Sequence, residues 1–128
     1  MSTFMDLLLK ADVKVFALPT AEVRIKRFTK IFGKDATLTV RAIPFETIED
    51  LRDGSKGGEF RLKMIREGVQ DFDFSSDALR EKLGVDKNLP SVEVIKKLFT
   101  AGEIEELYLM ISKISGYGAD TVEEIKKK

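Results

Sequence analysis

The chain has 128 residues, the length of one ordinary domain, and 43% of them are hydrophobic, which is enough to build a core. Its 22 basic and 22 acidic residues cancel, so there is no overall positive charge to neutralise the phosphates of a nucleic acid. The absence of cysteine and histidine excludes disulfides, thiol nucleophiles, histidine bases and most zinc or copper sites.

The first predicted element is a short helix at the N-terminus. Ser2 or Thr3 can cap it, and Phe4, Leu7 and Leu8 fall on one side. This segment carries an acidic residue and lacks a basic leader, so it does not have the pattern of a signal peptide. No segment of the chain approaches the roughly 20 apolar residues of a membrane helix. We therefore expect a soluble, intracellular protein without a membrane partner.

Two alternating segments follow the first helix. Residues 21–28 alternate apolar and polar side chains, and residues 38–42 do so again after a turn at 33–35. Two alternating runs around a glycine turn predict a β-hairpin, and Pro44 ends its second strand. A hairpin alone is only marginally stable, so it must pack on other elements.

The rest of the chain is predicted to be mainly helical. Residues 46–52 form one or two helical turns, a flexible glycine-rich loop spans 53–58, and a helix around residues 60–65 closes at Gly68. An irregular connector covers residues 71–74. A helix is predicted over 77–83, with Ser75 or Ser76 as its cap and Gly84 as its stop. Two more are predicted over 92–99 and over 104–114, and Gly116 stops the second of them. A last short helix would be capped by Asp120 and Thr121 and would end at Lys126 to Lys128.

This order of elements predicts an α+β fold: an N-terminal helix and β-hairpin followed by a mainly α-helical C-terminal two thirds. We expect one domain over residues 1–128, because no linker or repeat divides the sequence.

No residue pattern in the sequence fits a catalytic, cofactor or metal site. The loop at 53–58 lacks the order of a Walker phosphate loop. The acidic residues from Asp71 onward resemble the start of a calcium loop, but its sixth and twelfth positions hold Ser76 and Lys82. Adjacent glutamates on a helix do not converge as an acid–base pair. We therefore expect no enzyme, no cofactor, no metal and no small-molecule substrate.

One local cluster of basic residues, Arg24, Lys26, Arg27 and Lys30, interrupts the balanced charge. We interpret it as the solvent-facing side of a strand. Nucleic-acid binding through this cluster is the alternative, and the zero net charge disfavours it. We therefore expect no nucleic-acid partner.

The amphipathic helices near the C-terminus supply the candidate partner-binding residues. Leu98, Phe99, Ile104, Leu107 and Ile111 recur at helical spacing and form one apolar stripe. Such a stripe either binds a partner polypeptide or lies in the core.

The connector at 71–74 adds two aromatic candidates. Phe72 and Phe74 alternate onto one side of a segment too short to be a central strand. They either face a partner or fill the core.

Several segments in this order resemble the tail assembly chaperones of long-tailed bacteriophages and defective prophages, specifically the XkdN-like group of Gram-positive bacteria. The most specific part is Leu-Phe-x-x-Gly-Glu at 98–103 followed by Ser-Gly-Tyr at 115–117. The stretch after the hairpin departs from the family pattern, since it is shortened and glycine-rich. The other matching segments are Phe4 to Leu9, Val40 to Pro44, Ile65 to Phe74 and Val94 to Leu107.

The resemblance implies a non-catalytic protein that coats the tape measure protein in the host cytoplasm and keeps it soluble until tube subunits polymerise. It also implies self-association and absence from the finished virion. Of the surfaces in the sequence, we expect the predicted stripe to contact the tape measure protein. The alternative is a structural tail component, such as a tube-end or completion protein, that stays in the virion.

The lysines at 126–128 are encoded by consecutive A-rich codons, a place where ribosomal frameshifting could extend a tail chaperone of this kind. The alternative is that these lysines complement the dipole at a helix C-terminus.

Overall fold

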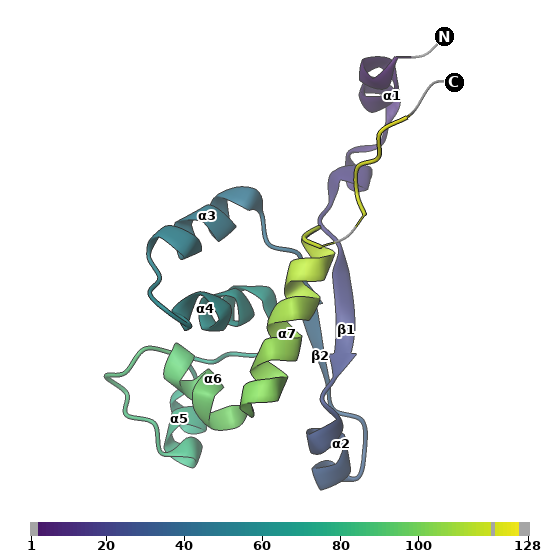
Figure 1. The fold of residues 1–128 in the computed structure, drawn as a ribbon. Coiled ribbons are helices and arrows are strands. Elements are labelled where there is room, and N and C mark those ends of the chain that lie inside the picture. The colour runs from purple at the N-terminus through teal and green to yellow at the C-terminus, as the bar shows by residue number, and fades with distance from the viewer. Residues whose placement is uncertain (1–2, 119, 126–128) are drawn as a thin grey trace.

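A computed structural model describes residues 3–118 and 120–125. Figure 1 shows a two-stranded hairpin with helices gathered along one side of it and a separate helical segment beyond its open end. The predicted α+β class, with an N-terminal helix, an antiparallel hairpin and a mostly helical remainder, is confirmed.

The N-terminal arm, defined here as residues 3–18, contains α1 (Phe4–Lys10) and a 3₁₀ helix (Val13–Phe16). A capping box starts α1: Thr3 accepts a hydrogen bond from the backbone of Asp6, and the Asp6 carboxylate accepts one from the backbone of Thr3. The predicted cap at Thr3 is therefore confirmed, while Ser2 lies outside the described residues. The arm projects away from the helices that follow the hairpin (Figure 1).

The hairpin pairs β1 (Thr20–Arg24) with β2 (Thr37–Arg41) in antiparallel register, from Thr20 opposite Arg41 to Arg24 opposite Thr37. The strands are joined by α2 (Lys26–Phe32), which ends at Gly33 with φ of 70°. The prediction that residues 21–28 form one strand was therefore wrong after Arg24. Ile25, Phe28 and Phe32 also recur at helical spacing, and Gly33 serves as a left-handed helix cap rather than as the hairpin turn.

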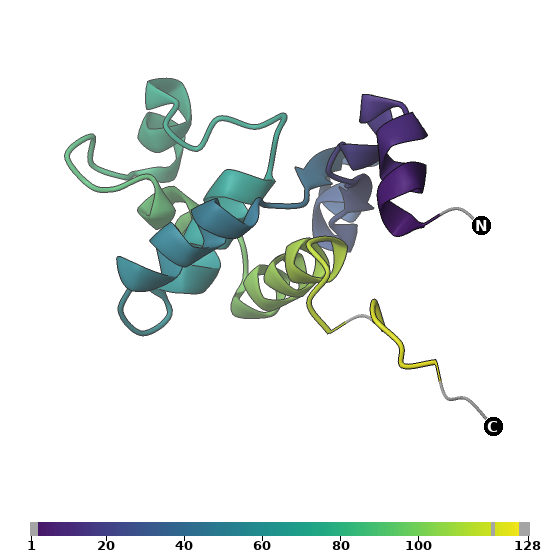
Figure 2. The ribbon, with the colours of Figure 1, turned by 90° about the horizontal axis from the view of Figure 1, so that it is seen from above.

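Among the described residues, five helices follow the hairpin and form the helical lobe. They are α3 (Phe45–Asp53), α4 (Glu59–Gly68), α5 (Asp77–Leu83), α6 (Val92–Leu98) and α7 (Ala101–Ile114). Helix α7 packs on α4, α6 and β2. Helix α4 also contacts α3 and α6, and α5 packs on α6. Figure 2 shows α3, α4 and α6 on one side of α7 and the hairpin on the other.

Several predicted helix boundaries are confirmed. Ser76 accepts a hydrogen bond from the backbone of Leu79 to start α5, and Gly84 ends that helix with φ of 72°. The connector at 71–74 is irregular, as predicted. The predicted last helix was wrong for residues 120–125, which are not helical; Val122 and Ile125 there are exposed, so no packing stabilises so short a helix. Residues 126–128 lie outside the described part of the chain.

The core lies where β2, α4, α6 and α7 meet. Its fully buried side chains include Val40 of β2, Ile65 of α4, Ile95 of α6 and Ile111 of α7. A single antiparallel bridge from Val40 to Val69 ties the end of α4 to the hairpin. The hairpin therefore obtains its stability from the helical lobe, as its short strands require.

Candidate partner-binding surfaces

The structure divides the predicted apolar stripe between the core and different surfaces. Ile111, Leu107 and Phe99 are 0%, 5% and 6% exposed and belong to the core. Leu98 and Ile104 are half-buried. Leu98 borders a groove beside α2, whereas Ile104 lies in a separate hollow beside Leu62 and Ala101. The five residues lie at the end of α6 and along α7, and they do not form one exposed surface.

The two aromatic candidates of the connector are also separated. Phe74 is 3% exposed and contacts Phe99 edge to face, with ring centroids 6.4 Å apart. Phe72 is half-buried and lies 4.7 Å from Phe74 between ring centroids. On the other side of Phe99, Phe28 packs edge to face at 6.1 Å. A row of aromatic rings therefore runs from the core to the surface at α2.

This row borders an apolar hollow of about 150 Å³, which we call the α2 groove. The groove lies at the closed end of the hairpin, between α2, the start of β2, the connector and the end of α6. An apolar cavity of about this size holds one benzene-sized group in other proteins. Its lining residues are Ile25, Phe28, Phe32, Ala36, Thr37, Leu38, Phe72, Leu98 and Phe99.

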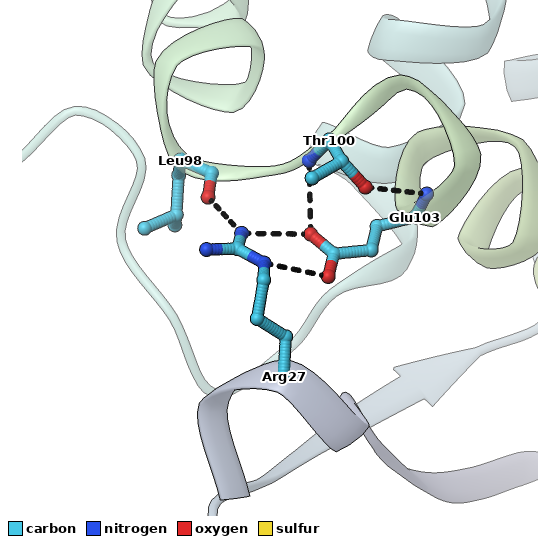
Figure 3. Close-up of polar contacts among 4 residues, drawn as sticks. All are labelled: Arg27, Leu98, Thr100 and Glu103. Carbon is cyan, nitrogen blue, oxygen red and sulfur yellow. Dashed lines mark hydrogen bonds and ion pairs between the residues drawn. The ribbon is translucent and has the colours of Figure 1, made fainter. Parts of the chain in front are cut away.

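A bidentate ion pair fixes the position of α2 (Figure 3). The Arg27 guanidinium donates from Nε to Oε2 of Glu103 at 2.9 Å and from Nη2 to Oε1 at 2.8 Å. It also donates to the Leu98 carbonyl at 3.0 Å. Glu103 in turn accepts a hydrogen bond from the backbone of Thr100 in the capping box of α7. One arginine therefore connects α2 to the end of α6 and the start of α7, and holds one wall of the groove in place.

The Glu103 carboxylate is strongly stabilised in its charged form. The hydrogen bonds from Arg27, together with a weaker effect of the hydrogen bond from Thr100, lower its pKa to about 2 against the opposing effect of burial. Arg27 also lies over the ring of Phe28, with its Cζ 4.4 Å from the ring centroid.

A second hollow, of about 230 Å³, lies between β1 and α7, and we call it the β1–α7 cleft. Val23 and Ile25 of the hairpin and Leu107 and Met110 of α7 form its apolar part. Its charged lining residues are Arg24, Lys26, Arg27, Glu103 and Glu106. An apolar floor with charges of both signs around it suits an amphipathic helix.

The N-terminal arm is a third apolar surface, and the sequence interpretation did not assign it to a partner. Five of the seven residues of α1 are apolar, which is more than one side of a helix needs. This excess of apolar residues is the sequence feature that could have indicated an exposed apolar surface here. The exposed apolar residues of the arm are Phe4, Met5, Leu7, Leu8, Leu9, Val13, Val15, Phe16 and Leu18.

The basic cluster does not form one strand face, contrary to the sequence interpretation. Arg24 is in β1, while Lys26, Arg27 and Lys30 are in α2. Arg24 pairs with Asp35 at 3.1 Å, and Arg27 pairs with Glu103. Two of the four charges therefore have acidic partners within the chain.

Within the described ranges 3–118 and 120–125, no three Asp or Glu side chains come together in a way that could hold a metal ion. Among the same residues, no helix has the length and apolarity needed to cross a membrane.

Comparisons with known proteins agree with this architecture. The family model described as "Phage XkdN-like tail assembly chaperone protein, TAC" matches residues 5–126. A crystal structure of the protein YqbN is similar, with a TM-score of 0.61 and 22% sequence identity, over 84% of this chain and 98% of that one. At this identity the likeness concerns the fold. No curated protein matches the chain.

Proposed function

The chain belongs to the family of phage XkdN-like tail assembly chaperones, and we propose that it binds the tape measure protein and keeps it soluble while the tail tube assembles. Tail assembly chaperones are not enzymes, and their partners are tail proteins. The finer assignment, to the tape measure protein, rests on the physical needs of that protein and on the surfaces described above.

A tape measure protein is a long helical chain with apolar stripes, and such stripes aggregate when they are exposed. The observation that supports the proposal most directly is the β1–α7 cleft. Its apolar floor includes Leu107, one of the residues predicted from the sequence, together with the more exposed Met110. The charges of Arg24 and Glu106 lie beside that floor. An amphipathic helix in the cleft would bury its apolar stripe and place its polar flanks against those charges.

Chaperone copies must cover a partner much longer than themselves, so we also propose that the chain self-associates. The protein acts, in this proposal, in the cytoplasm of the bacterial host and leaves before the virion is complete. Retention in the particle would instead indicate the alternative function, a tube-end or completion protein.

Co-expression with the tape measure protein of the same phage or prophage tests the proposal. We expect the tape measure protein to become soluble and to elute with an excess of this chain on a sizing column. A tape measure protein that stays insoluble while this chain elutes alone would contradict tape measure binding.

Two neighbouring residues of α7 provide matched variants for mapping the contact. Met110 is 37% exposed and lines the cleft, whereas Leu109 is 53% exposed and lies outside it. We expect Met110→Glu to fold normally and to lose most of the solubilised tape measure protein. Leu109→Glu, the control, should retain it. Equal loss in both variants, or in neither, would exclude the cleft as the contact.

Purified tails then separate a chaperone from a structural protein. Mass spectrometry of finished particles should detect tube and tape measure peptides but no peptides of this chain. Stoichiometric recovery of the chain from particles would support the structural alternative.

A further inference from the structure

The apolar residues of the N-terminal arm are left exposed by the part of the chain that the structure describes. On α1, Phe4, Leu7 and Leu8 recur at positions i, i+3 and i+4, and the first two are 68% and 61% exposed. Residues at this spacing form one face of a helix. A contiguous exposed apolar face of this kind marks a contact surface in folded proteins.

The surface of matching character is at the opposite end of the hairpin. The arm joins β1 at Thr20, and the α2 groove begins beyond the other end of that strand, at Ile25. Five strand residues span about 16 Å, and the arm points away from α2 (Figure 1). In this arrangement the arm of one chain does not meet the groove of the same chain.

We propose that α1 of one copy docks its Phe4, Leu7 and Leu8 face against the α2 groove of a second copy, with one of these side chains filling the groove. The groove volume of about 150 Å³ suits one aromatic or leucine side chain, and Phe28, Phe32 and Leu98 of the lining can pack around it. The half-buried Phe72 and the edge of Phe99, both predicted from the sequence as partner-binding residues, are then contacts between copies. The inference rests on the proposed self-association and names the surfaces that carry it.

This contact joins different surfaces of the two copies, so it is heterologous. Each copy that uses its arm still offers a groove, and each copy that receives an arm still has its own arm free. Such a contact builds an open row of subunits unless the rotation between copies closes a ring. A row is the geometry that covers an elongated partner with many copies of a small protein.

Two variants break the two halves of the contact separately. Phe4→Ala with Leu7→Ala removes most of the apolar face of α1 and places alanine, the strongest helix former, at both positions. Leu9→Ala is its control, because Leu9 is 77% exposed and lies about 100° around the helix from Leu8. Phe32→Lys places a charge at the groove, and Ile31→Lys is its control, since Ile31 is 61% exposed and does not line the groove.

The measurement is sedimentation velocity of the full chain without any tape measure protein, with thermal unfolding as a check on folding. We expect concentration-dependent assembly of the wild type and of both controls. Each disruptive variant alone should associate at least about tenfold more weakly, as for loss of a central interface anchor.

Mixing the two disruptive variants gives the sharpest result. The Phe4→Ala, Leu7→Ala chain keeps an intact groove, and the Phe32→Lys chain keeps an intact arm. Together they can form one contact and no more, so we expect a one-to-one dimer and no larger species.

A mixture that remains monomeric overturns the proposal, as does a wild type that never assembles. Normal dimerisation of Phe32→Lys alone also overturns it and indicates pairing of arm with arm. Because no tape measure protein is present, these results are independent of whether the chain binds one.

Discussion

Gly68, the last residue of α4, lies so close to Ile111 of α7 that a Cβ atom on Gly68 would be 2.6 Å from Ile111 Cδ1 and 3.0 Å from its Cγ1 and Cγ2. Ile111 is 0% exposed, so its side chain has little room to move aside. The two helices therefore pack closely because position 68 has no side chain, and this contact sets the position of α7, which carries one wall of the β1–α7 cleft.

We expect Gly68→Ala to lower the free energy of unfolding by about 1–3 kcal/mol, as overpacking of a filled core does. Gly102→Ala is the matched control, because Gly102 is also helical and a Cβ atom added there would have no neighbour within 4 Å. That change should be neutral or stabilise by about 0.4–1 kcal/mol. Urea unfolding of the three proteins measures both effects. A Gly68→Ala chain as stable as the wild type would contradict the close packing.

When residues of the apolar stripe are truncated to alanine, the loss in free energy of unfolding should depend on how buried each side chain is. Ile111→Ala removes a fully buried side chain and should cost about 2–5 kcal/mol of unfolding free energy. Leu98→Ala, in the half-buried rim of the α2 groove, should cost much less. Chemical denaturation of both variants tests this order. Equal losses would indicate that Leu98 is as much a core residue as Ile111.

The stripe also illustrates how far the sequence could predict the site. Helical spacing correctly placed Leu107 and Ile111 on one face of a helix, because periodicity reports which residues share a side. It does not report what covers that side. In the folded chain α4 and β2 pack against α7, so most of the stripe is internal. The surfaces that remain depend on tertiary contacts between residues far apart in the sequence.

In the hairpin too, some features follow from local sequence preferences and others depend on contacts between distant residues. The second strand, the caps at Thr3 and Ser76 and the stop at Gly84 follow from local residue preferences, and all are confirmed. The sequence of residues 25–28 is compatible with a strand and with a helix. In the folded chain this segment turns into α2, where Arg27 contacts Glu103 and Phe28 contacts Phe99. Those partners are more than 70 positions away, so no local pattern could have included them.

The Arg27–Glu103 pair predicts a specific dependence of stability on pH. The hydrogen bonds from Arg27 lower the pKa of Glu103 in the folded protein to about 2, below its ordinary value of 4.5. Its contribution to stability is therefore fully present above about pH 4.5 and is lost as the pH falls toward 2. Melting temperatures of the wild type and Glu103→Gln, measured between pH 6 and pH 2, should converge at the acidic end. A constant difference across that range would contradict the prediction.

The same pair predicts a structural result at neutral pH. Glu103→Gln keeps the size of the side chain but removes its charge, and Arg27→Lys cannot form the bidentate pair. In both variants α2 should be held less firmly, so amide hydrogens of α2 should exchange faster than in the wild type while those of α4 stay protected. Lys30→Gln is the control, because it changes a charge on the same exposed helix without touching Glu103.

Arg80 provides a test at a residue of α5 that the sequence analysis did not single out. It is 7% exposed, and its Nη1 donates to the carbonyls of Asp86 at 3.0 Å and Leu89 at 2.7 Å. This side chain therefore joins α5 to the loop between α5 and α6, alongside hydrogen bonds within the loop itself. Arg80→Met should keep most of the buried hydrocarbon but remove the hydrogen bond to the Leu89 carbonyl, at a cost of about 1–3 kcal/mol. The Asp86 carbonyl keeps the backbone N–H of Leu89 as a donor, at 3.1 Å.

Arg80→Met should loosen the loop between α5 and α6 before it unfolds the whole protein. Limited proteolysis of Arg80→Met should cleave between residues 84 and 91 at protease concentrations that leave the wild type intact. Lys82→Met, an exposed position on the same helix, should be cleaved no faster than the wild type. Cleavage of both variants at equal rates would show that the loop is held by contacts other than those of Arg80. Since α6 carries Leu98 at its end, a loosened loop should also weaken self-association through the α2 groove.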